Sequence, residues 1–184
     1  MKQNIQEIID KLIQGNLRFS NGNSLHPNID EIRKKATLEE QKPFAIIVGC
    51  SDSRIPPEII FDQGIGDLFI IRTAGYVIDN IAMGSIEYAI LHLDVKLIVV
   101  LGHENCGAIT ASYNKIKSSP NINNVVKLIT PNIKHSKNID DAINLHTMKI
   151  SRQIREHFSN LDIEILPLLY KLNTNEVSFL TLES

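Results

Sequence analysis

The stretch KLIVVLGHENCG, residues 96–107, contains the clearest strand signal in the chain. Its first half is an unbroken apolar run that ends at a glycine, which is typical of a strand buried on both faces of a parallel sheet. His103 and Cys106 follow directly, and we expect the segment 106–116 to be a helix. A buried strand that passes into a helix through a polar turn predicts one unit of a helix-covered parallel sheet.

Other segments continue this alternation of strands and helices. Residues 44–48 (FAIIV) and 68–72 (LFIIR) are short runs rich in β-branched residues, which favours buried strands. Residues 83–93 and 142–158 carry apolar side chains at helical spacing. A last strand and a hairpin that turns at 173–175 complete the pattern. The sequence therefore predicts an α/β fold with a mainly parallel central sheet of four strands, an antiparallel edge strand and flanking helices.

The N-terminal region is expected to form a helical arm. Apolar residues recur at helical spacing over residues 4–19, and the Gly-Asn pair at 15–16 should interrupt the helix near its end. This helix could pack on the core of its own chain or cover a second subunit. The polar segment 118–140 is expected to be a loop with one helical insert near residues 124–130.

The composition is that of an ordinary globular protein. Hydrophobic residues make up 43% of the chain and charged residues 22%, and the formal net charge is −2. This balance argues against a nucleic-acid or anionic-membrane binder, which normally carries a basic excess. The first residues do not read as a signal peptide, and no apolar run approaches the ~20 residues of a membrane span. Two cysteines are too few for a disulfide framework, which predicts a cytoplasmic location.

The reactive residues gather after two of the predicted strands. Cys50, Asp52 and Arg54 follow the first strand, and His103 and Cys106 follow the third. Functional groups of an open α/β sheet collect at the carboxyl ends of its strands, so neighbouring strands would bring these side chains together. Two cysteines and one histidine form a known zinc ligand set, and catalytic zinc sites keep a fourth position for water or substrate.

Simpler interpretations exist for each of these residues taken alone. A cysteine at a strand end is more often inert and buried, a single H-x-x-C match arises by chance, and Asp52 with Arg54 could be a solvated ion pair. The remaining histidines have no partner at ligand spacing and are expected at the surface or in packing roles: 26, 92, 135, 146 and 157. The coincidence of both clusters at matching strand ends is what favours a metal site.

Together the two motifs resemble those of the β-class carbonic anhydrases. The resemblance lies in Cys50-Ser-Asp52-Ser-Arg54 and in Gly102-His103-x-x-Cys106-Gly107, and it extends to GNLRF, IIRTAG and SIEYAILHL in the same order. It covers roughly residues 8–158. We accordingly expect one domain over residues 1–184, made of the helical arm (1–40) and a zinc-binding α/β core (41–184).

The resemblance implies a zinc enzyme for the reversible hydration of carbon dioxide to bicarbonate and a proton, by attack of zinc-bound hydroxide. Cys50, His103 and Cys106 would hold one zinc ion per chain. Asp52 would either pair with Arg54 or move in as a fourth metal ligand, which gives both residues of this pair a catalytic role.

The resemblance also implies a substrate pocket and a partner. Gln41 would hydrogen-bond the zinc-bound anion, Phe69 and Tyr88 would line the pocket, possibly across subunits, and Gly107 is assigned to the same pocket. Because the active sites of the family lie at a dimer interface, we expect a homodimer or homotetramer. Carbon dioxide or bicarbonate would be the small-molecule substrate, and no nucleic acid or membrane partner is expected.

Three other functions are compatible with these residues. The same scaffold could hydrolyse carbonyl sulfide or carbon disulfide, which are also small linear molecules. A non-catalytic zinc- or bicarbonate-binding module is less favoured, because a closed structural site has no use for Asp52, Arg54 and Gln41. A Cys–His nucleophilic hydrolase would need no metal and would leave Cys50 or Cys106 open to alkylation.

Overall fold

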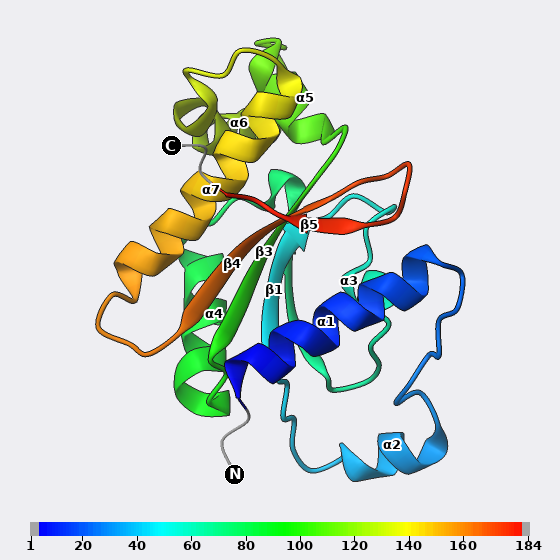
Figure 1. Ribbon diagram of the computed structural model, residues 1–184. Coiled ribbons are helices and arrows are strands. Elements are labelled where there is room, and N and C mark those ends of the chain that lie inside the picture. The colour runs from blue at the N-terminus through cyan, green and yellow to red at the C-terminus, as the bar shows by residue number, and fades with distance from the viewer. Residues whose placement is uncertain (1–3, 182–184) are drawn as a thin grey trace.

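The computed structural model describes residues 4–181 and shows a five-stranded sheet with helices packed against it (Figure 1). The strand order is β2-β1-β3-β4-β5, with parallel pairing throughout except between β4 and β5. This confirms the predicted α/β fold, including the antiparallel edge strand. The strands are β1 (Ala45–Cys50), β2 (Leu68–Thr73), β3 (Leu97–His103), β4 (Glu164–Tyr170) and β5 (Val177–Phe179).

Helices connect and cover these strands. Helix α7 packs along β3 and β4, and α4 packs against β2. No helix within residues 4–181 is long and apolar enough to cross a membrane. The α-helices are α1 (Ile5–Ser20), α2 (Glu31–Ala36), α3 (Pro57–Ile60), α4 (Asn80–Leu93), α5 (Gly107–Tyr113), α6 (Pro120–Ile129) and α7 (Ile139–His157), and the 3₁₀ turns are η1 (Ala74–Tyr76) and η2 (Thr130–Ile133).

The two central strands place the reactive residues at one edge of the sheet. Every residue of β1 and β3 is buried, which explains why their sequences are continuous apolar runs and not alternating ones. The two strands are parallel neighbours, and Gly49 pairs with Leu101 in their register. Cys50 at the end of β1 and His103 at the end of β3 therefore reach the same edge.

The first helix runs without a break through Gly15 and Asn16, so the predicted interruption is wrong. Both residues serve packing instead. A Cβ at Gly15 would lie 1.8 Å from the carbonyl oxygen of Phe61, so only glycine permits this close crossing. Asn16 is buried, and its side chain bonds to the C-terminal hairpin through Asn175 O (2.9 Å) and the Val177 N–H (2.8 Å). Helix α1 thus packs on the core of its own chain.

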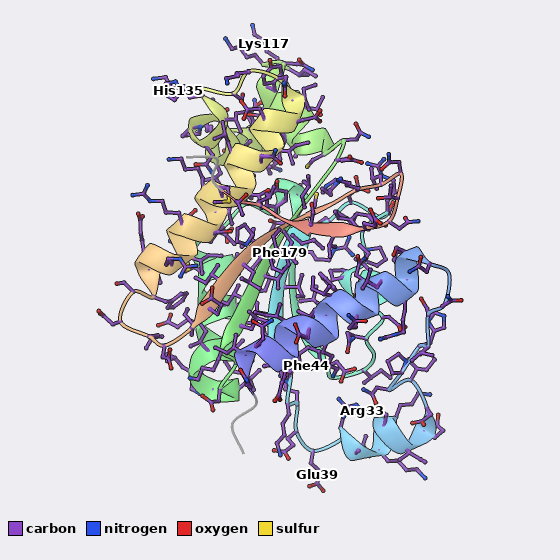
Figure 2. The ribbon with its side chains drawn as sticks, in the orientation of Figure 1. Arg33, Glu39, Phe44, Lys117, His135 and Phe179 are labelled. Carbon is purple, nitrogen blue, oxygen red and sulfur yellow. The ribbon has the colours of Figure 1, made fainter. Side chains whose placement is uncertain are left out.

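The segment between α1 and β1 is held by two buried carboxylates. Asp62 accepts hydrogen bonds from Arg18 Nε at 2.6 Å and from the Leu25 N–H at 3.0 Å. Asp67 accepts one from Arg33 Nη2 at 3.0 Å, and Figure 2 shows Arg33 at the helix α2 that this contact ties down. Neither α2 nor α3 is predicted from the sequence, because both are too short to show an apolar period.

Three helices, α4, α6 and α7, begin earlier than the sequence indicates, and α4 starts at Asn80 instead of residue 83. The insert expected near residues 124–130 is α6, which starts at Pro120, a residue whose fixed φ suits the first turn of a helix. Helix α7 starts at Ile139 because the side chain of Asn138 accepts the backbone N–H of Asp141 as an N-cap. Apolar spacing locates the middle of a helix, whereas the cap decides where it begins.

Candidate metal centre

The ends of β1 and β3 bring Cys50, His103 and Cys106 into one buried cluster. The Sγ atoms of the cysteines are 3.9 Å apart, and the ligand atoms of all three residues lie within 4.8 Å of one another. Both cysteines are free thiols. Two zinc–sulfur bonds of ~2.3 Å at the tetrahedral angle would set their sulfurs about 3.8 Å apart. The arrangement therefore fits a zinc ion held by these three residues.

The His103 ring is oriented as a metal ligand would be. Its Nδ1 lies 2.8 Å from the carbonyl oxygen of Glu104, so Nδ1 carries the proton and donates it. Its Nε2 is buried and has no hydrogen-bond partner among the described residues. A buried nitrogen without a hydrogen-bond partner costs folding free energy. A metal ion bound between this nitrogen and the two thiols would accept its lone pair and remove that cost.

The two thiols ionise very differently. The Cys106 thiol donates to Cys50 Sγ, and this contact, aided by the Gly75 N–H at 3.3 Å, lowers the pKa of Cys50 to about 4 against the opposing effect of burial. The proximity of Cys50 and burial raise the pKa of Cys106 well above its ordinary value. The pair therefore needs a compensating cation before both sulfurs can be thiolates, and a divalent metal supplies that charge.

Asp52 and Arg54 form a bidentate ion pair beside the cluster. Arg54 Nε donates to Asp52 Oδ1 at 2.9 Å and Nη2 to Oδ2 at 2.7 Å, while the Arg54 backbone N–H adds a third bond at 3.0 Å. The Arg54 hydrogen bonds lower the pKa of Asp52 to about 2, so the carboxylate is ionised at any physiological pH. In this structure Asp52 belongs to the ion pair and stands outside the three-residue cluster.

Arg72 is a site residue that the sequence analysis missed. Its Nε donates to Cys50 O at 2.8 Å and its Nη2 to Asp52 O at 2.6 Å, which fixes the backbone that carries both side chains. Arg72 lies near the end of β2, where it pairs in register with Gly49 of β1. An arginine near a strand end shows no spacing motif, so only the strand pairing reveals this role.

Gly75 and His146 extend the support of Cys50 into the core. Gly75 has a left-handed φ of 65°, and a Cβ there would lie 2.8 Å from Ile129 Cδ1, so glycine is required. The Gly75 N–H donates to Cys50 Sγ, and its carbonyl accepts from His146 Nε2 at 2.9 Å. His146 Nδ1 accepts in turn from Asn132 Nδ2 at 3.1 Å. The ring is therefore held neutral in a single tautomer.

The histidines outside the cluster match the expectation of surface or packing roles. His146 is fully buried and packs on Tyr76, with ring centroids 4.9 Å apart. The other four are exposed, and Figure 2 shows His135 at the periphery of the molecule: His26, His92, His135 and His157.

Burial of His146 predicts acid sensitivity of the fold. Burial lowers the pKa of His146 to about 4, whereas an unfolded histidine titrates near 6.5. Below pH 6.5 the unfolded state binds the proton more readily, so the stability present at neutral pH is lost as the pH falls toward 4. We expect the free energy of unfolding to drop by about 2 kcal/mol between pH 7 and pH 5 through this residue.

Urea unfolding of metal-free protein at several pH values measures this effect. The matched variant is His146→Gln, which keeps an N–H donor but cannot titrate. Between pH 7 and pH 5, its free energy of unfolding should fall by about 2 kcal/mol less than that of the original protein. Equal pH dependence in the two proteins would show that His146 is not the group responsible.

The residues expected to line a substrate pocket are not gathered around the cluster in one chain. Only Gly107, the first residue of α5, adjoins it. Phe69 and Tyr88 form a ring pair with centroids 6.3 Å apart. Phe69 pairs with Ile46, which lies four positions before Cys50 in β1, roughly 13 Å along the strand. Gln41 is exposed and precedes β1 altogether, so the length of that strand separates it from Cys50.

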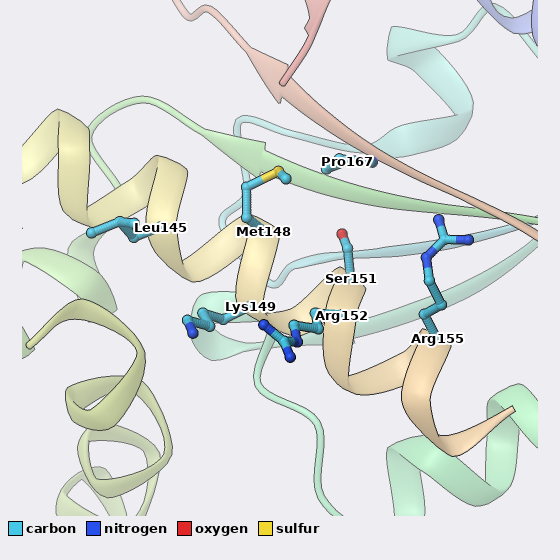
Figure 3. Close-up of a pocket in the computed structure, with 7 residues that line it drawn as sticks. All are labelled: Leu145, Met148, Lys149, Ser151, Arg152, Arg155 and Pro167. Carbon is cyan, nitrogen blue, oxygen red and sulfur yellow. The ribbon is translucent and has the colours of Figure 1, made fainter. Parts of the chain in front are cut away.

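One hollow lies away from the cluster, between α7 and β4 (Figure 3). Its volume is about 400 Å³, and it contains none of the predicted site residues. Figure 3 shows basic and apolar side chains of α7 around it, together with Pro167 of β4. The three-residue cluster and the Asp52–Arg54 pair therefore define the candidate site, and the size of a cavity does not.

Comparisons with known proteins agree with this site. The model of the family described as carbonic anhydrase matches residues 45–177. A carbonic anhydrase of Mycolicibacterium smegmatis is 47% identical over 126 residues, which cover 66% of this chain and 61% of that protein. This chain thus spans less than two thirds of the length of that relative.

Solved structures share the fold. The β-carbonic anhydrase CcaA gives a TM-score of 0.71 at 23% identity, covering 97% of this chain and 93% of its own. One of two tetrameric β-carbonic anhydrases from Sordaria macrospora gives 0.69 at 21% identity, covering 95% of this chain and 97% of its own. At these identities the likeness supports the fold alone. With the family match over most of its length, the chain belongs to the β-class carbonic anhydrases.

Proposed function

We propose that the protein catalyses the reversible hydration of carbon dioxide to bicarbonate and a proton, with one zinc ion held by Cys50, His103 and Cys106. The observation that carries the proposal is the buried Nε2 of His103, which has no hydrogen-bond partner within residues 4–181 and lies close to the two free thiols. Bound there, zinc would supply a Lewis acid that lowers the pKa of a coordinated water and so provides a nucleophile near neutral pH. Family membership supports this choice of reaction.

The side chains around the cluster have distinct tasks in this proposal. Three protein ligands leave a fourth position for water, as catalytic zinc sites do. Arg54 occupies both oxygens of Asp52, so the carboxylate is held away from that position. Asp52 remains ionised and can accept a hydrogen bond from the attacking water, which orients the water toward carbon dioxide. Asp52 would become a fourth metal ligand only if this ion pair with Arg54 were broken.

We also propose that the working molecule is a homodimer or a higher homo-oligomer. Gln41, Phe69 and Tyr88 lie toward the opposite end of the sheet from Cys50 in their own chain, so they could serve only the site of a second copy. The exposed face of α4, which includes Ile81, Tyr88 and Leu91, offers an apolar surface for that copy. The tetramers from Sordaria macrospora support self-association on this fold.

The same features support a proposal for the organisation and location of the chain. We propose one domain in which the arm (1–40) is fastened to the core (41–184), because Ile8 and Leu12 of α1 join the hydrophobic core. Two free thiols at the proposed metal site suit a reducing compartment, so we place the protein in the cytoplasm.

Removal of the metal tests the proposed function. Purified protein should contain about one zinc per chain and hydrate carbon dioxide in a stopped-flow assay. Incubation with a zinc chelator should abolish the activity, and added zinc should restore it. Full activity in zinc-free protein would refute the proposal. Carbonyl sulfide and carbon disulfide are assayed in parallel, and hydrolysis of either without carbon dioxide hydration would assign the site to those substrates.

A further inference from the structure

We propose that Glu104 is a positioning residue for His103, acting through a hydrogen bond from its carboxylate to the turn between β4 and β5. This inference rests on the proposed zinc site. Neither the ligand cluster nor the Asp52–Arg54 pair includes the Glu104 side chain. Its charge therefore has no part in the function described above, although it directly follows a proposed metal ligand in the chain.

Three contacts fix Glu104 in place. Its carbonyl oxygen accepts the Nδ1–H of His103 at 2.8 Å. Its backbone N–H donates to Tyr170 O at 3.1 Å, and its carboxylate Oε2 accepts the backbone N–H of Leu172 at 2.9 Å. The residue that orients the imidazole is therefore attached at both its backbone and its side chain to one neighbouring segment.

That segment is itself rigid. Within the turn, the Asn175 N–H donates to Lys171 O at 2.9 Å and Tyr170 Oη donates to Asn175 Oδ1 at 2.8 Å. From outside, Asn16 of α1 holds the turn through Asn175 O and the Val177 N–H. The anchor used by the Glu104 carboxylate is thus braced by both the hairpin and the N-terminal helix.

The anchor matters because the chain beyond Glu104 is a sharp turn. Asn105 has a left-handed φ of 53°, so strand geometry no longer fixes the peptide that carries the Glu104 carbonyl. The bond from the Glu104 carboxylate to the Leu172 N–H restrains this peptide in place of the strand. Partners that orient a metal-ligating histidine typically change metal affinity by 10–100-fold when they are removed. Loss of the carboxylate anchor should therefore loosen the ring and speed the loss of zinc.

The release of zinc to a colorimetric chelator from the loaded, full-length protein tests this role. Glu104→Ala removes the anchor, Glu104→Asp keeps the charge but shortens the reach, and Glu104→Gln keeps an oxygen acceptor of the same length without the charge. Asp140→Ala is the charge control, since Asp140 lines the same hollow as Glu104. Asn138→Ala is the stability control, since it removes the N-cap of α7 at a cost of about 1 kcal/mol.

We expect the zinc dissociation rate constant to rise about 10-fold or more in Glu104→Ala and Glu104→Asp, and to stay within about 3-fold of the original in Glu104→Gln and in both controls. The absorption spectrum of the cobalt-substituted protein should shift in the first two variants alone. The inference would be overturned if Glu104→Ala released zinc at the original rate, or if Glu104→Gln released zinc as fast as Glu104→Ala. Because zinc release is measured without substrate, an inactive protein would refute the proposed function and leave this result standing.

Discussion

Replacing Arg54 with alanine is expected to lower kcat/KM for carbon dioxide hydration by roughly 100-fold or more while one zinc stays bound per chain. Arg54 provides all three hydrogen bonds that the structure gives to the Asp52 carboxylate oxygens, and only the backbone one survives in the variant. The ionised carboxylate would then be free to turn toward the metal site and compete with water there. With zinc bound, the two thiolates would already offset its charge, and a third anion would weaken it further as a Lewis acid.

Stopped-flow hydration and metal analysis on the same preparation check this result. The matched control is Arg152→Ala, which breaks another exposed arginine–carboxylate pair, with Glu156, on α7. It should leave both zinc content and rate unchanged. Arg54→Lys should recover little activity, because an ammonium group cannot hold both carboxylate oxygens as a planar guanidinium does. Full activity in Arg54→Ala would remove the ion pair from the mechanism.

Replacing Cys50 with serine is expected to abolish stoichiometric zinc and, with it, carbon dioxide hydration. A hydroxyl group is similar in size to a thiol but does not ionise near neutral pH, so the zinc–thiolate bond is lost. Zinc that binds only the folded state raises the melting temperature, so a chelator should lower the melting temperature of the original protein. The melting temperature of the serine variant should not respond to the chelator.

Metal analysis and thermal unfolding with and without chelator measure these effects. Ser51→Ala provides the control, because Ser51 is the exposed neighbour of Cys50 and bonds to Thr73 O through its backbone N–H, which the substitution keeps. That variant should keep zinc, activity and the chelator response. A Cys50→Ser protein that still holds one zinc per chain would show that the metal lies elsewhere.

The sheet and the closeness of Cys50, His103 and Cys106 could be predicted because their signals are local. Each strand is a short apolar run, and the reactive residues directly follow two of these runs. The carboxyl ends of parallel neighbours meet at one edge, so the position along each strand was enough to bring the side chains together.

The supporting residues could not be predicted because their partners lie far away in the sequence. His146 bonds to Gly75, 71 residues earlier, and Glu104 bonds to Leu172, 68 residues later. The contact of Arg72 with the backbone of Cys50 and Asp52 depends on the register of β2 against β1. The predicted interruption of α1 at the Gly-Asn pair was wrong for the same reason. Both residues have low helix propensity, but here packing partners distant in the sequence decide their conformation.

The bonds between Asn16 and the C-terminal hairpin carry a consequence for how the molecule is assembled in time. They connect residues 159 and 161 positions apart, near the two limits of the described chain. Contacts of such large sequence separation require the closure of a very long loop, which places them among the last to form during folding. A ribosome must release the chain from Asn16 through Val177 before the hydrogen bonds behind His103 can form. The proposed anchor of His103 is therefore unavailable until the C-terminal hairpin has been synthesised.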